Sequence, residues 1–399
     1  RGVSALTLDW ATLRSLAGMT DDIGILSIYA SLDPQRRTEP QSRPAWEVRV
    51  RQELSRVRDE ARRQRPRDEW RALEERLETL QMALDDLLDP ASPGQGQALF
   101  AAVRSGETRR FSLQVPLVDR VVLRLRPYLR PLLTAWSTAG PAGAVSVCAE
   151  EVRAVDLRFG LAENVAVFPY LGSVEQSELK GPATSLPGMA QHSAKHRDLY
   201  ERRELDKLLR FLRSLGPRLI DLAKQREWGF LVVTGQADLA FPMAEALPTR
   251  NGLSVLTLEH PVNHLSPAQV AEVAAPTLAQ ARQRHHRALA EQARDAAFAG
   301  GNGAYGLSET LAALQQGQVA HLLLDADGQW YGRATADGVL APDGEVPPGV
   351  DPSRLRPEPD LGERMIEYAF RDSADITLLT GEAAAPLSDA GGVGALLRW

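Results

Sequence analysis

Cysteine is nearly absent from this sequence, and so are several enzyme signatures. Cys148 is the only cysteine among 399 residues, which excludes an intramolecular disulfide and a cysteine-rich metal site. The chain also lacks the H-E-x-x-H zinc motif, the G-x-S-x-G nucleophile turn and the G-x-x-x-x-G-K-[ST] phosphate loop. We therefore expect neither a metal nor a cofactor.

Long apolar runs are missing as well. No stretch of about 18 consecutive apolar residues, the length that crosses a membrane, occurs in the chain. The first residues do not combine a basic segment with an apolar run, which is the pattern of a secretory signal. Scarce cysteine is typical of a reducing compartment. Together these absences predict a cytoplasmic protein with no membrane partner.

The chain also lacks an excess of positive charge. The formal net charge is −6, whereas proteins that bind nucleic acid usually present a basic surface. Residues 301–399 contain 15 acidic and 6 basic residues, and the rest of the chain is slightly basic. Either the two ends face different partners or the last third is a well-solvated acidic domain. Residues 104–130, with seven arginines and two acidic residues, are a candidate nucleic-acid face.

What is present is typical of a multidomain α/β protein. Hydrophobic residues make up 44% and charged residues 25% of the chain, as in an average globular protein. At roughly 150 residues per domain, the length predicts two or three domains. Amphipathic helical periods alternate with short apolar runs, which predicts three separate α/β domains. We place them at residues 1–139, 140–273 and 274–399.

The clearest pattern lies in the last of these domains. It predicts helices over residues 308–316 and 361–371 and strands over residues 319–324 and 375–380. Gly317 directly follows the first helix, so we expect it in the left-handed conformation that ends many helices.

Two charged helices are predicted in the first domain, over residues 46–64 and 69–88, because apolar residues recur three and four apart. Pro66 separates them in the turn Gln64-Arg65-Pro66-Arg67. Arg65 and Arg67 are candidate RNA ligands, since each guanidinium can bind a phosphate through a fork of hydrogen bonds. The alternative is a solvated turn without a ligand.

Four segments resemble the archaeo-eukaryotic peptide-chain release factor family and its Pelota-like relatives. Residues 305–324 match the family's pattern of a glycine, a helix with Ala-Leu, a Gly-x-Val turn and an apolar strand. Residues 391–399, Gly-Gly-Val-Gly-Ala-Leu-Leu-Arg-Trp, resemble the family's closing segment and are similar to the end of the bacterial Balon-type hibernation factors. Residues 10–34 and 127–133 resemble the start and the end of the family's N-terminal domain.

The resemblance implies the release-factor/Pelota arrangement of three domains. These would be a decoding-side-like N-terminal domain, a middle domain with the catalytic loop, and a C-terminal domain with a fold like that of ribosomal kink-turn proteins. It implies a tRNA-mimicking translation factor that binds ribosomal RNA in the A site, acts in hibernation or rescue, and meets a translational GTPase of the elongation-factor type. Residues 64–67 lack the family's Asn-Ile-Lys-Ser motif, so we predict no reading of stop codons.

The family's middle domain carries a Gly-Gly-Gln loop before a long basic helix, and the corresponding residues here are Met189, Ala190 and Gln191. In the family, the Gln places a water at the ester of peptidyl-tRNA, and the glycines adopt backbone angles that a Cβ disfavours. We therefore predict RNA binding without peptide release. One alternative is a peptidyl-tRNA hydrolase or tRNA-cleaving factor with Gln191 as its catalytic residue. Another is an RNA-binding protein that acts away from the ribosome.

The residues around Gln191 are the main candidates for RNA contact. Proline, glycine and polar residues before Ser193 predict a coil that projects from the middle domain, with a helix from Ser193 onward. The candidate RNA-binding residues in this coil and helix are Gly188, Gln191, His192, Lys195, His196, Arg197, Arg202 and Arg203.

Two other patterns do not predict sites. The G-x-G-x-x-G at residues 301–306 follows a predicted helix, residues 267–298, whereas the dinucleotide fingerprint follows a strand. His285 and His286 are adjacent on that helix and point about 100° apart, which does not suit a shared metal.

Overall fold

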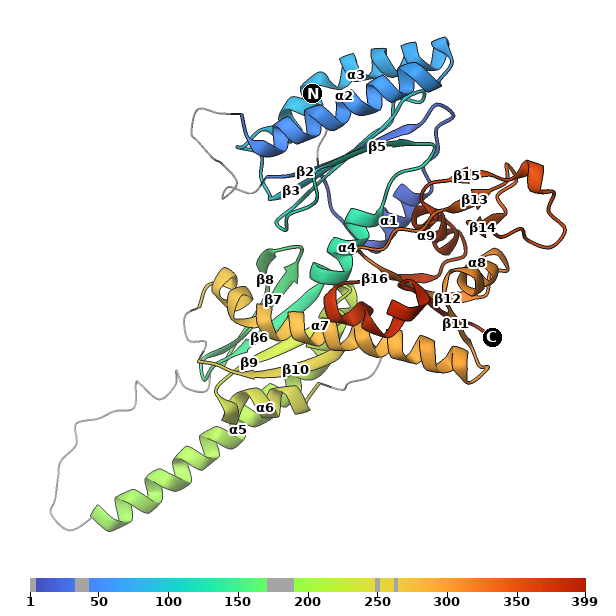
Figure 1. The fold of residues 1–399 in the computed structure, drawn as a ribbon. Helices are drawn as coiled ribbons and strands as arrows, with labels where there is room; N and C mark the ends of the chain where they lie inside the picture. The colour runs from blue at the N-terminus through green and yellow to red at the C-terminus, as the bar shows by residue number, and fades with distance from the viewer. Residues whose placement is uncertain (1–4, 33–42, 171–189, 248–251, 262–264) are drawn as a thin grey trace. The chain divides into compact units, whose positions relative to one another are not determined.

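The computed structural model describes residues 5–32, 43–170, 190–247, 252–261 and 265–399. The chain forms two compact units. The first unit contains residues 1–138 and 282–399, and the second contains residues 139–281. Each unit combines helices with mixed sheets, which confirms the predicted α/β class (Figure 1). Among the described helices, none has the length and apolar character needed to span a bilayer.

The division into three domains stays a prediction. The expected boundary after residue 139 lies at the border between the two units. The expected boundary after residue 273 falls inside helix α7 (Pro267–Phe298), which runs without a break from the second unit into the first.

The first sheet of the first unit has the strand order β1-β4-β3-β2-β5. Its strands are β1 (Ala5–Leu6), β2 (Ile25–Ser31), β3 (Gly96–Ala102), β4 (Thr108–Leu113) and β5 (Arg120–Arg124). Helices α2 (Ala45–Gln64) and α3 (Arg67–Leu88) cover one face of this sheet (Figure 1). Their apolar side chains pack against Leu26 and Ile28 of β2 and Leu99 of β3. Both predicted helices are therefore confirmed.

The second sheet of the first unit has the order β11-β17-β12-β16. Its strands are β11 (Gly303–Tyr305), β12 (Val319–Asp325), β16 (Asp375–Leu379) and β17 (Val393–Leu397). Helix α8 (Leu307–Gln315) packs on β17 and α9 (Leu361–Arg371) on β12 and β16. The last turns of α7 and the 3₁₀ segment Gly381–Ala390 contribute to a core around Leu323 and Leu379.

This part of the fold agrees with the pattern in the sequence. The two helices and two strands predicted here are confirmed as α8, α9, β12 and β16. Gly317 has a φ of 68°, the left-handed conformation expected after α8. A small three-stranded sheet lies between β12 and α9 along the chain, and its strands are β13 (Gly332–Ala334), β14 (Leu340–Pro342) and β15 (Arg356–Glu358).

The remaining helices of the first unit are α1 and α4. They comprise α1 (Trp10–Ala17) and α4 (Arg130–Ala139). The Trp10 ring on α1 lies 5.3 Å from the ring of Trp136 on α4 and 5.4 Å from that of Phe370 on α9. An aromatic contact therefore connects the N-terminal and C-terminal parts of this unit.

The second unit has one sheet, with the order β10-β9-β6-β7-β8. Its strands are β6 (Ala142–Val147), β7 (Glu151–Arg158), β8 (Leu161–Pro169), β9 (Phe230–Gly235) and β10 (Ser254–Glu259). Helices α5 (Ala190–Gln225) and α6 (Ala237–Glu245) pack on one face, around Val145 and Val233. The first turns of α7 pack on the other face, around Ala144. The sheet is therefore covered by helices on both sides, as expected where strands such as β10, β9 and β6 run parallel.

A histidine cluster lies where the second half of α7 meets β12 in the first unit. His286 on α7 is 8% exposed. Burial lowers its pKa to about 4, and the charges of His285, Arg282 and His321 act in the same direction. The pKa of His321 is also lowered by burial, an effect that Asp375 opposes.

We predict that this cluster destabilises the protein in acid. The pKa of His286 is about 4 in the folded chain and 6.5 in an ordinary environment. Below pH 6.5 the unfolded chain therefore binds more protons, and stability falls until the pH passes about 4. The loss reaches about 3 kcal/mol. Melting temperatures measured by circular dichroism from pH 7 to pH 4 should fall less steeply for His286→Leu than for the wild type. Equal slopes would contradict the prediction.

Candidate RNA-binding surface

The turn between α2 and α3 is set by Pro66. Arg65, which precedes it, is extended, with φ −104° and ψ 154°, because a residue before proline avoids helical angles. Helix α2 therefore ends at Gln64, and α3 begins at Arg67. The two helices form a hairpin, and we call residues 62–71 the hairpin tip.

The two arginines predicted to bind RNA in this turn differ in their contacts. The Nη1 of Arg65 donates a hydrogen bond to the carbonyl oxygen of Ile23 and lies 3.3 Å from Oε2 of Glu69. Arg67 is exposed, and it forms no ion pair within the described part of the chain. Arg65 therefore holds the hairpin tip against the segment before β2, whereas Arg67 is available to a phosphate.

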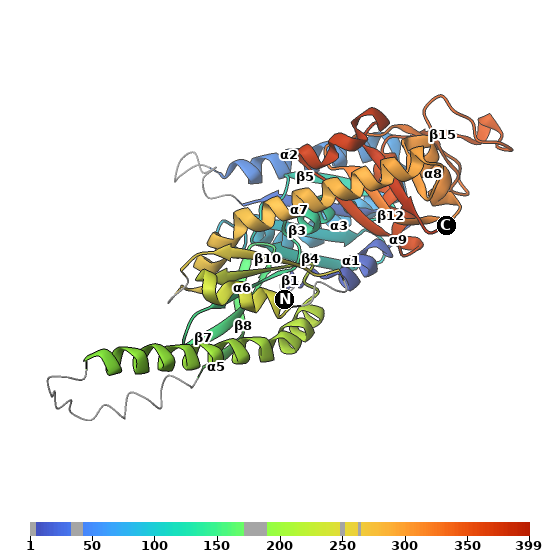
Figure 2. The same cartoon turned by 90° about the horizontal axis from the view of Figure 1, so that it is seen from below.

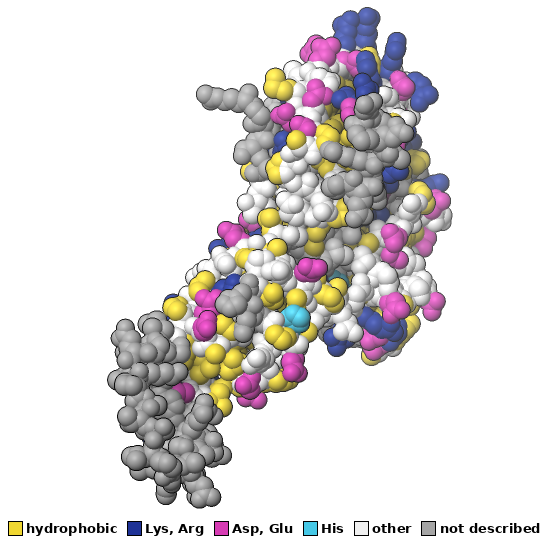
Figure 3. All heavy atoms as spheres, turned by 90° about the vertical axis from the view of Figure 1, so that its left-hand side faces the viewer, with side chains coloured by type: hydrophobic (Ala, Val, Ile, Leu, Met, Phe, Trp, Pro, Cys, Tyr) yellow, Lys and Arg dark blue, Asp and Glu magenta, His cyan; other side chains and the backbone are white. Residues whose placement is uncertain are grey.

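Three further arginines lie at the hairpin tip, although no motif marks them. Arg62, Arg63 and Arg71 are exposed, and none pairs with a carboxylate in the described ranges. Arg67 and Arg71 are four residues apart on α3 and share one face of the helix, a spacing that the sequence already contains. Lys and Arg side chains gather at the upper end of Figure 3, where α2 and α3 lie.

We predict that the hairpin tip contributes to RNA binding. Arg67→Glu combined with Arg71→Glu should weaken binding to ribosomes about tenfold, because each reversal removes a phosphate contact and adds repulsion. Co-sedimentation at fixed salt measures the effect. Arg287→Glu with Arg294→Glu, on α7, is the control with the same change of charge. Equal losses of ribosome binding from both pairs would show that binding depends on net charge and not on a contact of the hairpin tip.

The start of α5 differs from the prediction. A coil was expected up to Ser193, but the helix begins at Ala190. Ala190 and Gln191 are good helix formers, and no glycine or proline follows Gly188 until residue 216. Gln191 therefore lies in the first turn of a helix and not near the tip of a coil.

The other predicted RNA ligands of this region fall into two groups. Gly188 lies outside the described residues. The backbone of the remaining candidates forms the first turns of α5, and they are Gln191, His192, Lys195, His196, Arg197, Arg202 and Arg203. Arg203 is exposed. One long helix therefore carries these basic residues toward its N-terminal end.

A protein-family model matches the part of the chain that contains α5. Residues 127–282 match the model described as bacterial archaeo-eukaryotic release factor family 10. Over these residues the chain is similar to this release factor family. The matched segment begins three residues before α4, includes the whole sheet of the second unit and ends within α7. The resemblance noted in the sequence is therefore confirmed. No curated protein sequence matches the chain.

Several solved structures are similar to this chain. An archaeal translation termination factor is 17% identical, with 98% of this chain and 96% of that chain covered and a TM-score of 0.24. Pelota from Thermoplasma acidophilum is 14% identical, with coverage of 76% and 80% and a TM-score of 0.24. Ribosome-bound archaeal Pelota is 12% identical, with coverage of 100% and 95% and a TM-score of 0.41. Such scores provide no residue-by-residue correspondence.

A buried carboxylate next to the arginine-rich segment 104–130 has no signature in the sequence. Glu363 on α9 is 2% exposed. Its Oε2 accepts the N–H of Leu129 at 2.9 Å, and its Oε1 accepts the N–H of Arg130 at 3.0 Å. Burial raises the pKa of Glu363 to about 7. The carboxylate therefore lies at the N-terminus of α4 and connects the N-terminal and C-terminal parts of the first unit.

Proposed function

We propose that this protein is a ribosome-binding translation factor that occupies the A site in hibernation or rescue and does not release the nascent peptide. The supporting observation is the replacement of the family's two glycines by Met189 and Ala190, inside the segment that matches the family model. Ala190 and Gln191 lie in α5, and helical backbone has a negative φ. The backbone freedom that two glycines provide is therefore missing next to Gln191.

The surface charge supports RNA binding by separate parts of the chain. Exposed arginines gather at the hairpin tip of the first unit, and the candidate basic residues lie at the start of α5 in the second. Residues 301–399 are acidic, which favours a protein partner over RNA. A translational GTPase of the elongation-factor type and a cytoplasmic location are part of the same proposal.

Sedimentation of the full chain with vacant and translating 70S ribosomes tests the proposal. We expect co-sedimentation that weakens as salt rises and that competes with tRNA in the A site. Labelled peptidyl-tRNA on the same ribosomes should release little peptide. Failure to co-sediment would overturn the ribosomal role and leave an RNA-binding protein that acts elsewhere. Rapid release of peptide would favour the alternative, a peptidyl-tRNA hydrolase that uses Gln191.

A further inference from the structure

Two cavities lie beside β5 in the first unit, with volumes of about 550 and 450 Å³. Both cavities are lined by Arg56, Val121, Val122, Arg124 and Pro359. The smaller cavity, which we call the β5 pocket, is therefore a neighbour of the larger one along β5.

Arginine is the most frequent charged residue in the lining of the β5 pocket. Its lining contains two carboxylates, Glu53 and Asp360, and four arginines, Arg56, Arg120, Arg124 and Arg130. Arg56, Arg124 and Arg130 have carboxylate partners, which are Glu53 and Glu60 for Arg56, Glu358 and Asp360 for Arg124, and Asp360 for Arg130. The charge that remains for an anionic ligand is therefore that of Arg120.

One arginine of the pocket has no acidic partner. Arg120 forms no ion pair in the part of the chain that the structure describes. Its Cζ lies 5.2 Å from the centre of the Tyr128 ring, and its Nη1 donates to the Tyr128 hydroxyl. Tyr128 is 2% exposed. A rigid ring therefore orients the Arg120 guanidinium and leaves its charge to a ligand.

A second arginine, Arg130, is buried in the wall of the pocket and is 8% exposed. Its Nη1 donates to the carbonyl oxygen of Gly328 at 2.7 Å, and its Nη2 donates to Oδ1 of Asp360 at 3.1 Å. Its Nε is buried without a hydrogen-bond acceptor, and Oε1 of Glu363 lies 4.0 Å from it. A buried donor of this kind needs an acceptor oxygen.

Gly362 allows Arg130 to take this position. A Cβ on residue 362 would lie 1.9 Å from Nη2 of Arg130 and 2.9 Å from the ring of Trp330. The Arg130 guanidinium stacks over the same ring, with its Cζ 5.2 Å from the ring centre. In the wall of the pocket, the Arg130 guanidinium therefore packs between the Trp330 ring and Gly362, where a larger residue would not fit.

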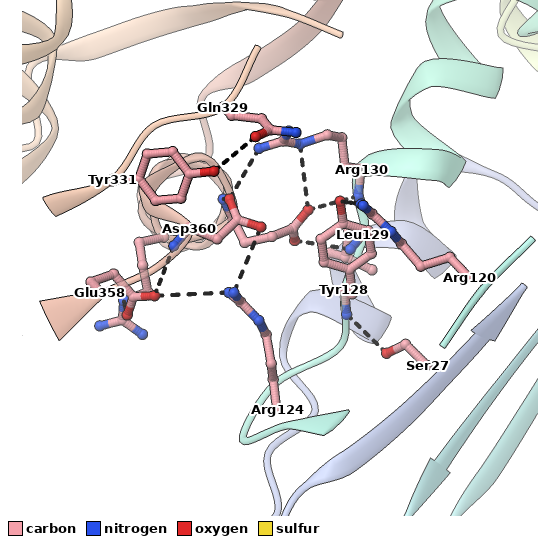
Figure 4. A network of polar contacts seen from close by, with 12 residues as sticks. Ser27, Arg120, Arg124, Tyr128, Leu129, Arg130, Gln329, Tyr331, Glu358 and Asp360 are labelled. Carbon is pink, nitrogen blue, oxygen red and sulfur yellow. Dashed lines mark hydrogen bonds and ion pairs between the residues drawn. The ribbon is translucent and has the colours of Figure 1, made fainter. Parts of the chain in front are cut away.

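The pocket also presents an aromatic ring to solvent. Tyr331 is 58% exposed, and its hydroxyl donates to Oε1 of Gln329 at 2.8 Å. Figure 4 shows Tyr331 and Gln329 beside the Arg130 guanidinium, with Asp360 below them. Guanidinium groups bind phosphate oxygens, and exposed aromatic rings stack on unpaired bases.

We propose that the β5 pocket binds a nucleotide, with the phosphate at Arg120 and Arg130 and the base stacked on Tyr331. Two sources share this chemistry, a free ribonucleotide and an unpaired nucleotide of an RNA strand. The inference goes beyond the proposed function, because it concerns a pocket of the first unit that does not depend on Gln191 or on α5.

Isothermal titration of the full chain without ribosomes tests the pocket. The probes are AMP, the 5′-phosphorylated dinucleotide pApA, adenosine and inorganic phosphate. AMP and pApA should bind at least about tenfold more tightly than adenosine or phosphate, because only they provide both groups. Arg120→Gln should weaken the binding of both nucleotides about tenfold. Tyr331→Ala should weaken the binding of AMP and leave that of phosphate unchanged. Arg287→Gln, an exposed change on α7, is the control.

Each result has a defined meaning. Tighter binding of pApA than of AMP supports an RNA strand as the source, and the reverse order supports a free nucleotide. The proposal is wrong if neither nucleotide binds, if both variants bind AMP as the wild type does, or if phosphate binds as tightly as AMP. Ribosomes are absent from this experiment, so a negative titration does not contradict the proposed function, which the co-sedimentation experiment tests separately. A failure of co-sedimentation likewise does not contradict nucleotide binding by the β5 pocket.

Discussion

Lys195→Glu combined with Arg197→Glu is expected to weaken ribosome binding about 100-fold at a fixed, near-physiological salt concentration. Both residues lie in the first turns of α5, and each reversal removes a phosphate contact and adds a repulsive charge. Loss of two contacts should also reduce the slope of log K against log salt by about 1.4 to 1.8. The slope separates this mechanism from misfolding, which would lower the bound fraction without that change.

The matched control is a pair of reversals farther along the same helix. Arg213→Glu with Lys224→Glu changes the net charge equally at two exposed positions of α5. We expect this pair to weaken binding much less. Equal losses would show that the start of α5 makes no specific contact.

Gln191→Ala distinguishes binding from catalysis at the same site. We expect it to weaken co-sedimentation only modestly, since it removes one neutral hydrogen-bonding group. The wild type should already release little labelled peptide. Rapid release that Gln191→Ala abolishes would overturn the binding-only proposal and support the hydrolase alternative.

Glu363→Ala is expected to destabilise the first unit by about 3–5 kcal/mol. The change leaves two buried N–H groups, those of Leu129 and Arg130, without their acceptor and removes a carboxylate that lies 4.0 Å from the Arg130 guanidinium. Thermal unfolding at pH 8 measures the loss. Hydrogen exchange of the peptide that contains Leu129 and Arg130 should accelerate in the same variant.

Two comparisons make the Glu363 prediction specific. Glu382→Ala, at an exposed position of the same unit, should change stability by no more than about 0.5 kcal/mol. The pKa of Glu363 is about 7 in the folded chain against an ordinary 4.5. The folded state therefore binds more protons between these values, and the wild type should gain stability from this group as the pH falls from 7 to 4.5. Glu363→Ala should lose that gain, and unchanged unfolding at pH 8 would contradict the prediction.

The sequence by itself determined the α/β class and most elements of the C-terminal part. Helices α8 and α9 and strands β12 and β16 follow from apolar periodicity, which depends on residues within a few positions of one another. Gly317 ends α8 for an equally local reason, because it takes a φ of 68° without a steric cost. The resemblance to the release factor family also came from short segments.

Tertiary structure decided the features that depend on distant residues. Arg65 and Arg67 are equivalent in the sequence, but contact with Ile23 makes Arg65 a structural residue. The carboxylate of Glu363 accepts the N–H of Arg130 across a sequence separation of 233 residues. No local pattern encodes such a contact, because only the packing of α9 beside α4 brings a carboxylate and two amide groups within hydrogen-bond distance.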